Sequence, residues 1–303
     1  MHRPTLETVS PVPARPPRRR TALPLLLTAG LALLAAGCGA LPASSARSTD
    51  SRTVSLRVDG RDRTYLLEPA LSVPAGRKAA LVAVLHQEGG TPEGVAKETA
   101  LQDLRRAGAT LVYPAGVDHS WDAGKCCGVP SRQGVDDVRF LDAVFADAAR
   151  RDAVDPRREA LVGYSSGGML TYHYVCARPG RLAVAVVVSG SLESSCAAGI
   201  TVPDVLTLHG KADGTIGLTR PIFITKLGLA PRPAASTLGI LTTSAGCDRG
   251  ITTQAYGAEV RRWLGCRGGT VEALLIPYAG HGWGTLDASR RTMAFLRSKL
   301  LGD

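Results

Sequence analysis

The sequence has few aromatic residues and, beyond its first forty residues, no long apolar run. Phe, Trp and Tyr make up 5% of the 303 residues. They are not interleaved with basic residues in the stripe that nucleic-acid-binding proteins use, so no nucleic-acid partner is expected. No later apolar stretch reaches the roughly 20 residues that a membrane-spanning helix needs. No internal repeat is visible, and the remaining chain reads as one globular domain.

Patterns that bind metals are also missing. None of the seven cysteines forms a pair separated by two residues, and no histidine cluster accompanies them. A zinc site is therefore not expected, and we predict no metal and no cofactor. One cysteine, Cys38, lies in the N-terminal leader. The other six form an even number, which in an exported protein indicates disulfides, although free buried thiols stay an alternative.

The cysteine positions favour one pair. Cys247 and Cys266 flank an expected helix–strand corner and are predicted to bond to each other. Adjacent cysteines rarely bond, because the ring strains the peptide between them. The sequence does not separate the three pairings open to the remaining four cysteines: Cys126, Cys127, Cys176 and Cys196.

What the chain does contain is typical of a packed, turn-rich protein. Hydrophobic residues make up 45% of it, with 34 Gly and 19 Pro. This composition argues against disorder and fits many tight turns. The formal net charge is +10, part of which lies in the leader. The rest is spread out and is interpreted as a soluble basic surface.

The N-terminus carries the clearest targeting signal. A basic stretch at 15–20 precedes a mostly apolar run from Leu25 to Ala36, which ends in Ala-Ala-Gly-Cys at 35–38. This pattern predicts a signal peptide over 1–37 of the lipoprotein type, with Cys38 lipidated and anchored to the outer face of a bacterial membrane. The alternative is an ordinary cleaved signal peptide with an incidental cysteine. Residues 38–52 are small and polar and predict a flexible tether.

The segment 53–303 alternates strand and helix patterns. An opening hairpin is expected over 53–67, and continuous apolar runs predict strands buried on both faces. These runs lie at 79–85, 109–113, 159–163, 183–189, 205–208 and 271–276. Helical patterns lie at 92–106, 137–151, 166–177, 234–245 and 287–300, with Asp136 a candidate cap of the second. The alternation predicts an α/β fold, with a mostly parallel central sheet and helices on both faces.

One motif in this order carries chemistry. The strand at 159–163 leads into Gly-Tyr-Ser-Ser-Gly at 163–167, and a helix follows. A Gly-x-Ser-x-Gly sequence between a strand and a helix is the nucleophile elbow of the α/β-hydrolase fold. Side chains two residues on either side of the serine would collide, so both places need glycine. Ser165 is therefore the predicted nucleophile.

A serine nucleophile needs a base and an orienting acid, which follow it in the order acid, then histidine. His281 comes directly after the last apolar strand and is the predicted base. Asp213 follows an earlier strand and is the predicted acid. Its rival Asp204 precedes that strand and would lie at the opposite end of the sheet. His209 is expected to bond within its own loop.

The oxyanion hole should combine two backbone N–H groups. One is that of Ser166, at the start of a helix whose dipole favours negative charge. The other should come from the loop after the strand at 79–85, with Glu88 or Gln87 as the donor. A simple surface turn is the alternative interpretation of this loop.

With these residues identified, the chain resembles a known family from residue 53 to the C-terminus. The matching stretches are L-H-Q-E-G-G-T at 85–91, W-D-A-G-K-C-C-G at 121–128, V-D-D-V-R-F-L at 135–141, G-Y-S-S-G-G-M at 163–169, H-G-K-A-D at 209–213 and G-H-G-W at 280–283, together with Cys247 and Cys266. These are similar to secreted poly(3-hydroxybutyrate) depolymerase-like esterases and to the feruloyl and acetylxylan esterases of carbohydrate esterase family one.

The resemblance implies the same triad, Ser165, Asp213 and His281. It also implies substrate-binding roles for Trp121 and Trp283, although a core role is equally open for either, and we place Tyr164 in the same group. Three departures stand out. Gln87 replaces the usual glycine, the stretch 214–235 lacks the common Val-Pro-Tyr pattern, and Leu241 replaces a tryptophan. The last two affect the substrate pocket more than the chemistry.

The sequence thus predicts a secreted or lipid-anchored serine esterase acting through an acyl-enzyme. Polyhydroxyalkanoate, feruloyl or acetyl-polysaccharide esters are the expected substrates. One alternative is a peptidase or amidase on the same triad. Another is a non-catalytic surface binding protein that keeps the fold.

Overall fold

A computed structural model describes residues 50–302 of the chain. The predicted signal peptide, the lipidation site Cys38 and most of the predicted tether lie outside the described residues. Within residues 50–302, no helix is both long and apolar enough to cross a bilayer.

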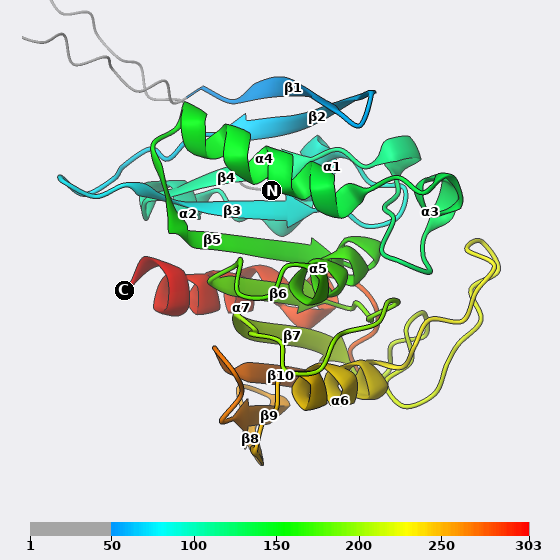
Figure 1. Cartoon of the computed structure of the whole chain (residues 1–303). Coiled ribbons are helices and arrows are strands. Elements are labelled where there is room, and N and C mark those ends of the chain that lie inside the picture. Colours follow the sequence, from blue (N-terminus) through cyan, green and yellow to red (C-terminus); the bar gives the residue numbers. More distant parts are fainter. Residues whose placement is uncertain (1–49, 303) are drawn as a thin grey trace, which may run out of the picture. The chain divides into compact units, whose positions relative to one another are not determined.

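A ten-stranded sheet forms the centre of this domain, in the order β1-β2-β4-β3-β5-β6-β7-β10-β9-β8 (Figure 1). The six strands from β4 to β10 in this order run parallel to one another. Antiparallel strands complete both edges. The strands are β1 (Arg52–Val58), β2 (Arg61–Glu68), β3 (Ala79–Leu85), β4 (Ala109–Pro114), β5 (Val154–Tyr164), β6 (Val184–Val188), β7 (Asp204–Gly210), β8 (Arg249–Ala255), β9 (Ala258–Leu264) and β10 (Val271–Ile276).

Helices cover both faces of the sheet, which confirms the predicted α/β architecture. The helices are α1 (Pro92–Thr99), α2 (Asp103–Arg106), α3 (Gly128–Gln133), α4 (Asp137–Arg151), α5 (Ser166–Ala177), α6 (Ala234–Ser244) and α7 (Ala288–Leu296), with short turns η1 (Val117–His119), η2 (Gly284–Leu286) and η3 (Arg297–Leu301). Figure 1 shows α4, α5 and α6 in front of the sheet. Their apolar side chains share one core, while those of α1, α2 and α7 belong to a second core on the opposite face.

The central strands are buried on both faces, as their continuous apolar runs predict. In β3, Leu81, Ala83 and Leu85 face the first core. The intervening residues Ala80, Val82 and Val84 face the second core. All of β3 is buried. Burial of both faces explains why this strand carries no polar position.

Helix α4 begins and ends where the sequence predicts. The side chain of Asp136 accepts a hydrogen bond from the backbone N–H of Arg139 at 2.8 Å and caps the helix. The helical pattern at 92–106, by contrast, is divided between α1 and α2. Ala100 ends α1 in the left-handed conformation, with φ of 49°.

The prediction of a helix–strand corner between Cys247 and Cys266 is wrong in one respect. These cysteines flank the hairpin β8–β9, which the sequence pattern does not predict. Six residues of β8 are exposed, so the strand shows no apolar alternation. Its one local signal is the turn Tyr256-Gly257, where both residues have positive φ, 55° and 68°. Such turns match the twist of a hairpin.

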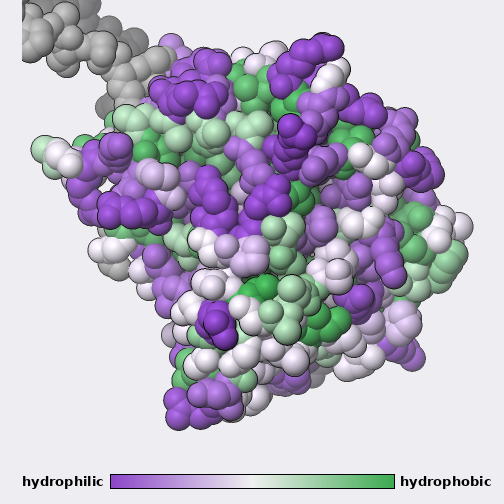
Figure 2. Space-filling view, in the orientation of Figure 1, coloured by the Kyte–Doolittle hydropathy of each residue, from purple (hydrophilic) through white to green (hydrophobic). Residues whose placement is uncertain are grey.

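The outer surface in this view is mixed in character. Figure 2 shows hydrophilic residues over much of this face and hydrophobic ones in small separate groups. One such group, at the right-hand edge, lies over the long connection between β7 and α6. We call residues 214–233 of this connection the wall segment, because part of it forms one wall of the cavity described below.

Candidate active site

Ser165 lies on the sharp turn between β5 and α5. Its backbone has φ of 54° and ψ of −117°, a left-handed conformation that a serine rarely adopts. The turn is tight because of its glycines. A Cβ on Gly163 would collide with the carbonyl oxygen of Gly167, and one on Gly167 would come within 2.6 Å of the carbonyl oxygens of Leu85 and His86. Only glycine fits at either place, as the elbow pattern requires.

Two neighbouring parallel strands bring the predicted acid and base to the same edge of the sheet. Asp213 follows β7, and His281 follows β10, which pairs with β7. The Nε2 of His281 lies 2.9 Å from Oγ of Ser165. Its Nδ1 lies 2.9 Å from Oδ2 of Asp213 and 3.1 Å from Oδ1. The structure thus joins the three predicted side chains in one hydrogen-bonded chain.

The rival acid Asp204 lies at the other end of β7. Its Oδ1 accepts hydrogen bonds from the N–H and the hydroxyl of Thr270, and it lies 3.3 Å from Nζ of Lys299. It contacts neither Ser165 nor His281, so it takes no part in this chain of hydrogen bonds.

The carboxylate of Asp213 is held in its charged form. Burial alone would raise its pKa, but hydrogen bonds and the charge of His281 outweigh burial and lower the pKa below the usual 3.8. The N–H groups of Thr215 and Ile216 also donate to Oδ1, both at 2.8 Å. An ionised acid that is fixed from two sides orients the imidazole of His281.

His209 is fully buried beside Asp213 and bonds within its own loop, as expected. Its Nε2 lies 2.8 Å from the carbonyl oxygen of Ile216 and 3.5 Å from Oδ2 of Asp213. Because the carbonyl only accepts, this nitrogen carries the proton. Burial lowers the pKa of His209, so its imidazole is neutral.

A cavity of about 180 Å³ lies beside the nucleophile. It is lined by Glu88, Ser165, Ser166, Met169, Thr215, Ile216, Ile224, Lys226 and Leu227. Glu88 and Ser166, two of the three predicted oxyanion residues, therefore border the same space as Ser165. Gln87 does not line this cavity. Five lining residues come from the wall segment, for which the sequence offered no functional signal beyond its departure from the family pattern.

The loop that carries Glu88 is held from behind by His86. The N–H of Gly116 donates to Nε2 of His86 at 3.0 Å, and Nδ1 lies 2.8 Å from the carbonyl oxygen of Gln87. The indole Nε1 of Trp121 donates to the carbonyl oxygen of His86 at 2.8 Å. Side chains behind the loop thus fix its backbone beside the nucleophile.

The burial of the two tryptophans does not fit their predicted substrate-binding roles. Trp121 has no exposed surface, and Trp283 is only 2% exposed. Trp283 donates to Oγ of Ser289 and packs edge-on against Tyr164, whose ring lies 5.8 Å from that of His281. None of these three aromatic residues lines the cavity. They pack behind the predicted catalytic residues and support them.

All six cysteines of the domain are paired. Cys247 bonds to Cys266, the pair that the sequence predicts, and Cys176 bonds to Cys196. The expectation that Cys126 and Cys127 do not bond to each other is wrong, because they form the third disulfide. The peptide bond between them is cis, and their Cα atoms lie 3.1 Å apart.

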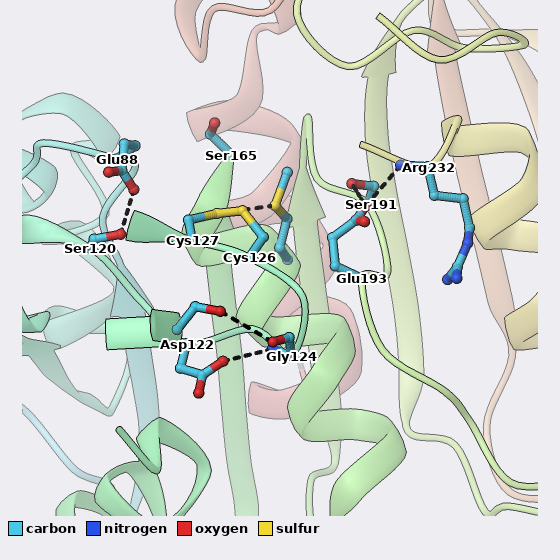
Figure 3. Close-up of a disulfide and its surroundings, with 12 residues drawn as sticks. Glu88, Ser120, Asp122, Gly124, Cys126, Cys127, Ser165, Ser191, Glu193 and Arg232 are labelled. Atoms are coloured by element: carbon cyan, nitrogen blue, oxygen red, sulfur yellow. Dashed lines mark hydrogen bonds between the residues drawn. A yellow bond between two sulfur atoms is a disulfide. The ribbon is translucent and has the colours of Figure 1, made fainter. Parts of the chain in front are cut away.

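The Cys126–Cys127 disulfide lies next to the site. Figure 3 shows it near Ser165, between the Glu88–Ser120 pair and the cluster of Ser191, Glu193 and Arg232. The Sγ of Cys127 lies 3.7 Å from Sδ of Met169, which lines the cavity. The disulfide therefore packs behind the cavity. Within residues 50–302, no group of three or more His, Cys, Asp or Glu side chains is arranged to hold a metal ion.

Comparison with known proteins shows that the chain is similar to esterases. No family model matches the sequence. NocK of Nocardia uniformis subsp. tsuyamanensis, whose name describes it as an esterase, is 33% identical over 235 residues, covering 73% of this chain and 64% of that protein. Feruloyl esterase C of Emericella nidulans is 26% identical over 216 residues, covering 66% of this chain and 76% of that protein. The chain thus spans less than two thirds of NocK.

Solved structures show the same fold. Acetyl xylan esterase from Aspergillus awamori matches with a TM-score of 0.61 at 16% identity, covering 82% of this chain and 98% of that chain. The predicted resemblance to carbohydrate esterases is therefore confirmed. The chain has the α/β-hydrolase fold, and its sequence is similar to esterases, feruloyl esterases among them.

Proposed function

We propose that this protein is a serine esterase that hydrolyses carboxylic esters through an acyl-enzyme. The observation that carries the proposal is the hydrogen-bonded chain from Ser165 through His281 to Asp213, with 2.9 Å at each step. A half-buried elbow serine with a histidine and a buried carboxylate in this geometry has the parts that acyl transfer needs.

In the first half-reaction, Nε2 of His281 takes the proton of Ser165 while Oγ attacks the ester carbonyl. The charge of Asp213 stabilises the imidazolium that forms. The N–H of Ser166 and a backbone N–H of the 87–88 loop donate to the oxyanion, and the N-terminus of α5 favours the same charge. The tetrahedral intermediate collapses, and the alcohol leaves with the proton from His281.

In the second half-reaction, water replaces the alcohol. His281 takes a proton from the water, which attacks the carbonyl of the acyl-enzyme, and the acid leaves as Oγ of Ser165 regains its proton. No group other than these side chains, backbone amides and water is required. The names of several sequence relatives support feruloyl esters as substrates. Acetyl-polysaccharide esters are included on the sequence resemblance. Hydroxyalkanoate esters are included on the sequence resemblance.

We also propose that the protein is exported and attached to the outer face of the membrane through Cys38. The sequence pattern at 35–38 supports this attachment. Three disulfides in one domain are typical of proteins that fold in an oxidising compartment, which supports export.

Replacing the nucleophile tests the proposed chemistry. Ser165→Ala should lose hydrolysis of p-nitrophenyl acetate and labelling by a fluorophosphonate probe, while Ser298→Ala, an exposed serine far along the chain, should keep both. A panel of feruloyl, acetylxylan and hydroxyalkanoate esters, with a matching anilide, then separates an esterase from an amidase. Undiminished turnover in Ser165→Ala would refute the proposal, and a wild type that neither labels nor turns over would favour a binding protein.

A further inference from the structure

The cavity beside Ser165 is small and mostly apolar. Its volume of about 180 Å³ is that of roughly six groups the size of a water molecule, at ~30 Å³ each. Four of its lining side chains are apolar: Met169, Ile216, Ile224 and Leu227. It fits a short aliphatic part of a substrate.

One cationic side chain, that of Lys226, lines this cavity. Lys226 lies at the tip of the wall segment, inside a turn closed by the hydrogen bond from the N–H of Ile224 to the carbonyl of Leu229, at 2.8 Å. Its Nζ lies 3.8 Å from the place that a Cβ on Gly89 would occupy. The ammonium group therefore reaches from the wall segment to the loop that carries Glu88, across the cavity that Ser165 lines.

This cation has no counter-ion in the described part of the chain. Lys226 is exposed to solvent. Between residues 50 and 302, no carboxylate lies within ion-pair distance of its Nζ, and this Nζ donates to no protein acceptor. The other charged lining residue is Glu88. Its carboxylate accepts a hydrogen bond from Oγ of Ser120 at 2.6 Å, and Figure 3 shows it turned toward Ser120. An apolar space bordered by an exposed, unpaired cation matches a short chain that ends in an anion.

We infer that the cavity takes short ester substrates that carry a carboxylate, with Lys226 pairing with that carboxylate. This inference rests on the proposed esterase function and names a substrate class for it. The carboxylate would lie at the far end of a short aliphatic chain of about four to six atoms, measured from the ester carbonyl, a size comparable with the cavity volume. Lys226 is then a specificity-determining residue and takes no part in the bond-making steps.

The test compares matched anionic and neutral esters. For the acyl side, monomethyl glutarate is paired with methyl pentanoate. For the alcohol side, 4-acetoxybutyrate is paired with butyl acetate. The wild type should show a higher kcat/KM for the anionic member of at least one pair, and Lys226→Met should lower that ratio roughly fivefold, or more if the contact is desolvated. The pair that responds identifies the part of the substrate that enters the cavity.

Two variants and one condition control the test. Lys226→Arg keeps the charge and should keep most of the preference. Lys78→Met, at the opposite end of the sheet, removes one positive charge and should leave both ratios unchanged. Raising the salt concentration from ~0.05 M to ~0.5 M should lower the preference of the wild type, because the pair is screened.

Failure of the inference and failure of the proposed function look different. If the neutral esters are cleaved in a Ser165-dependent way and Lys226→Met leaves both ratios unchanged, the inference is wrong and the esterase function stands. If the wild type cleaves p-nitrophenyl acetate but no ester of either pair, the inference alone is wrong. If it cleaves neither p-nitrophenyl acetate nor any ester of the panel, the proposed function itself is wrong.

Discussion

The Nδ1 of His281 lies 2.9 Å from the Oδ2 of Asp213, a carboxylate whose side chain is completely buried. An amide at position 213 would keep the shape but lose the charge, and its NH₂ group would favour the wrong tautomer of the imidazole. Asp213→Asn should therefore lower kcat by about 10⁴-fold with p-nitrophenyl acetate. Urea unfolding will show whether the variant is folded.

Asp204→Asn is the matched control for that change. Asp204 bonds to Thr270 at the other end of β7, so its replacement should cost stability and leave kcat near the wild-type value. If Asp204→Asn lowers kcat as much as Asp213→Asn does, the assignment of the acid is wrong.

The second prediction concerns His86 and pH. Burial lowers the pKa of His86 from 6.5 to about 4, and its neutral form accepts from Gly116 at Nε2. Between these two values the unfolded chain binds a proton that the folded chain does not, so the free energy of unfolding rises with pH across this range. The contribution is present above pH 6.5, and about 3 kcal/mol of it is lost as the pH falls to 4.

Urea unfolding at pH 7 and pH 4.5 measures this contribution. The wild type should lose more stability between the two pH values than His86→Gln, in which position 86 carries no titratable group. Equal losses in the two proteins would contradict the burial of a neutral imidazole at this position.

The third prediction concerns the Cys247–Cys266 disulfide, which closes a loop of 19 residues. Replacing both cysteines with serine should lower the free energy of unfolding by about 2–4 kcal/mol, through loss of the constraint on the unfolded chain. The end of β9 pairs with the start of β10. The start of β10 lies at the end of the parallel strands opposite to the one where Ser165 lies. The kcat of the variant should therefore equal that of the wild type at a temperature where both are folded, and a tenfold lower kcat would contradict this placement.

The fourth prediction tests the elbow itself. Gly167→Ala places a methyl group 2.6 Å from two carbonyl oxygens at the end of β3. The turn must shift, so fluorophosphonate labelling of Ser165 should fall at least about 100-fold even though the serine is present. Gly239→Ala, in α6, meets no atom within 4 Å and should keep full labelling.

The central strands could be predicted because their residues are apolar at every position, a pattern that follows from burial on two faces. The hairpin β8–β9 could not, because β8 is almost wholly exposed and packing places no apolar constraint on its side chains. The break at Ala100 within the helical pattern at 92–106 depends on a left-handed backbone that alanine does not signal.

The positions of the triad members could be predicted from the sequence, because each of them follows a parallel strand and the carboxyl ends of these strands meet at one end of the sheet. The lining of the cavity was not predictable, because residues such as Ile224 and Lys226 carry no chemistry that marks them in a sequence. Nor does the motif at 121–128 reveal that Trp121 points into the core and holds the carbonyl of His86. The side of a loop that an indole faces depends on packing that a single sequence does not show.

The wall segment is fixed at both ends and exposed in its middle. At one end, Ile216 donates to Asp213, and at the other the N–H of Arg232 donates to the carboxylate of Glu193 at 2.9 Å. Loops of other length or composition can therefore be exchanged between these two anchors without disturbing the hydrogen bonds that hold the acid. Under the proposed function, an exchange of this loop by divergence or by grafting would change which substrates are cleaved and leave the triad in place.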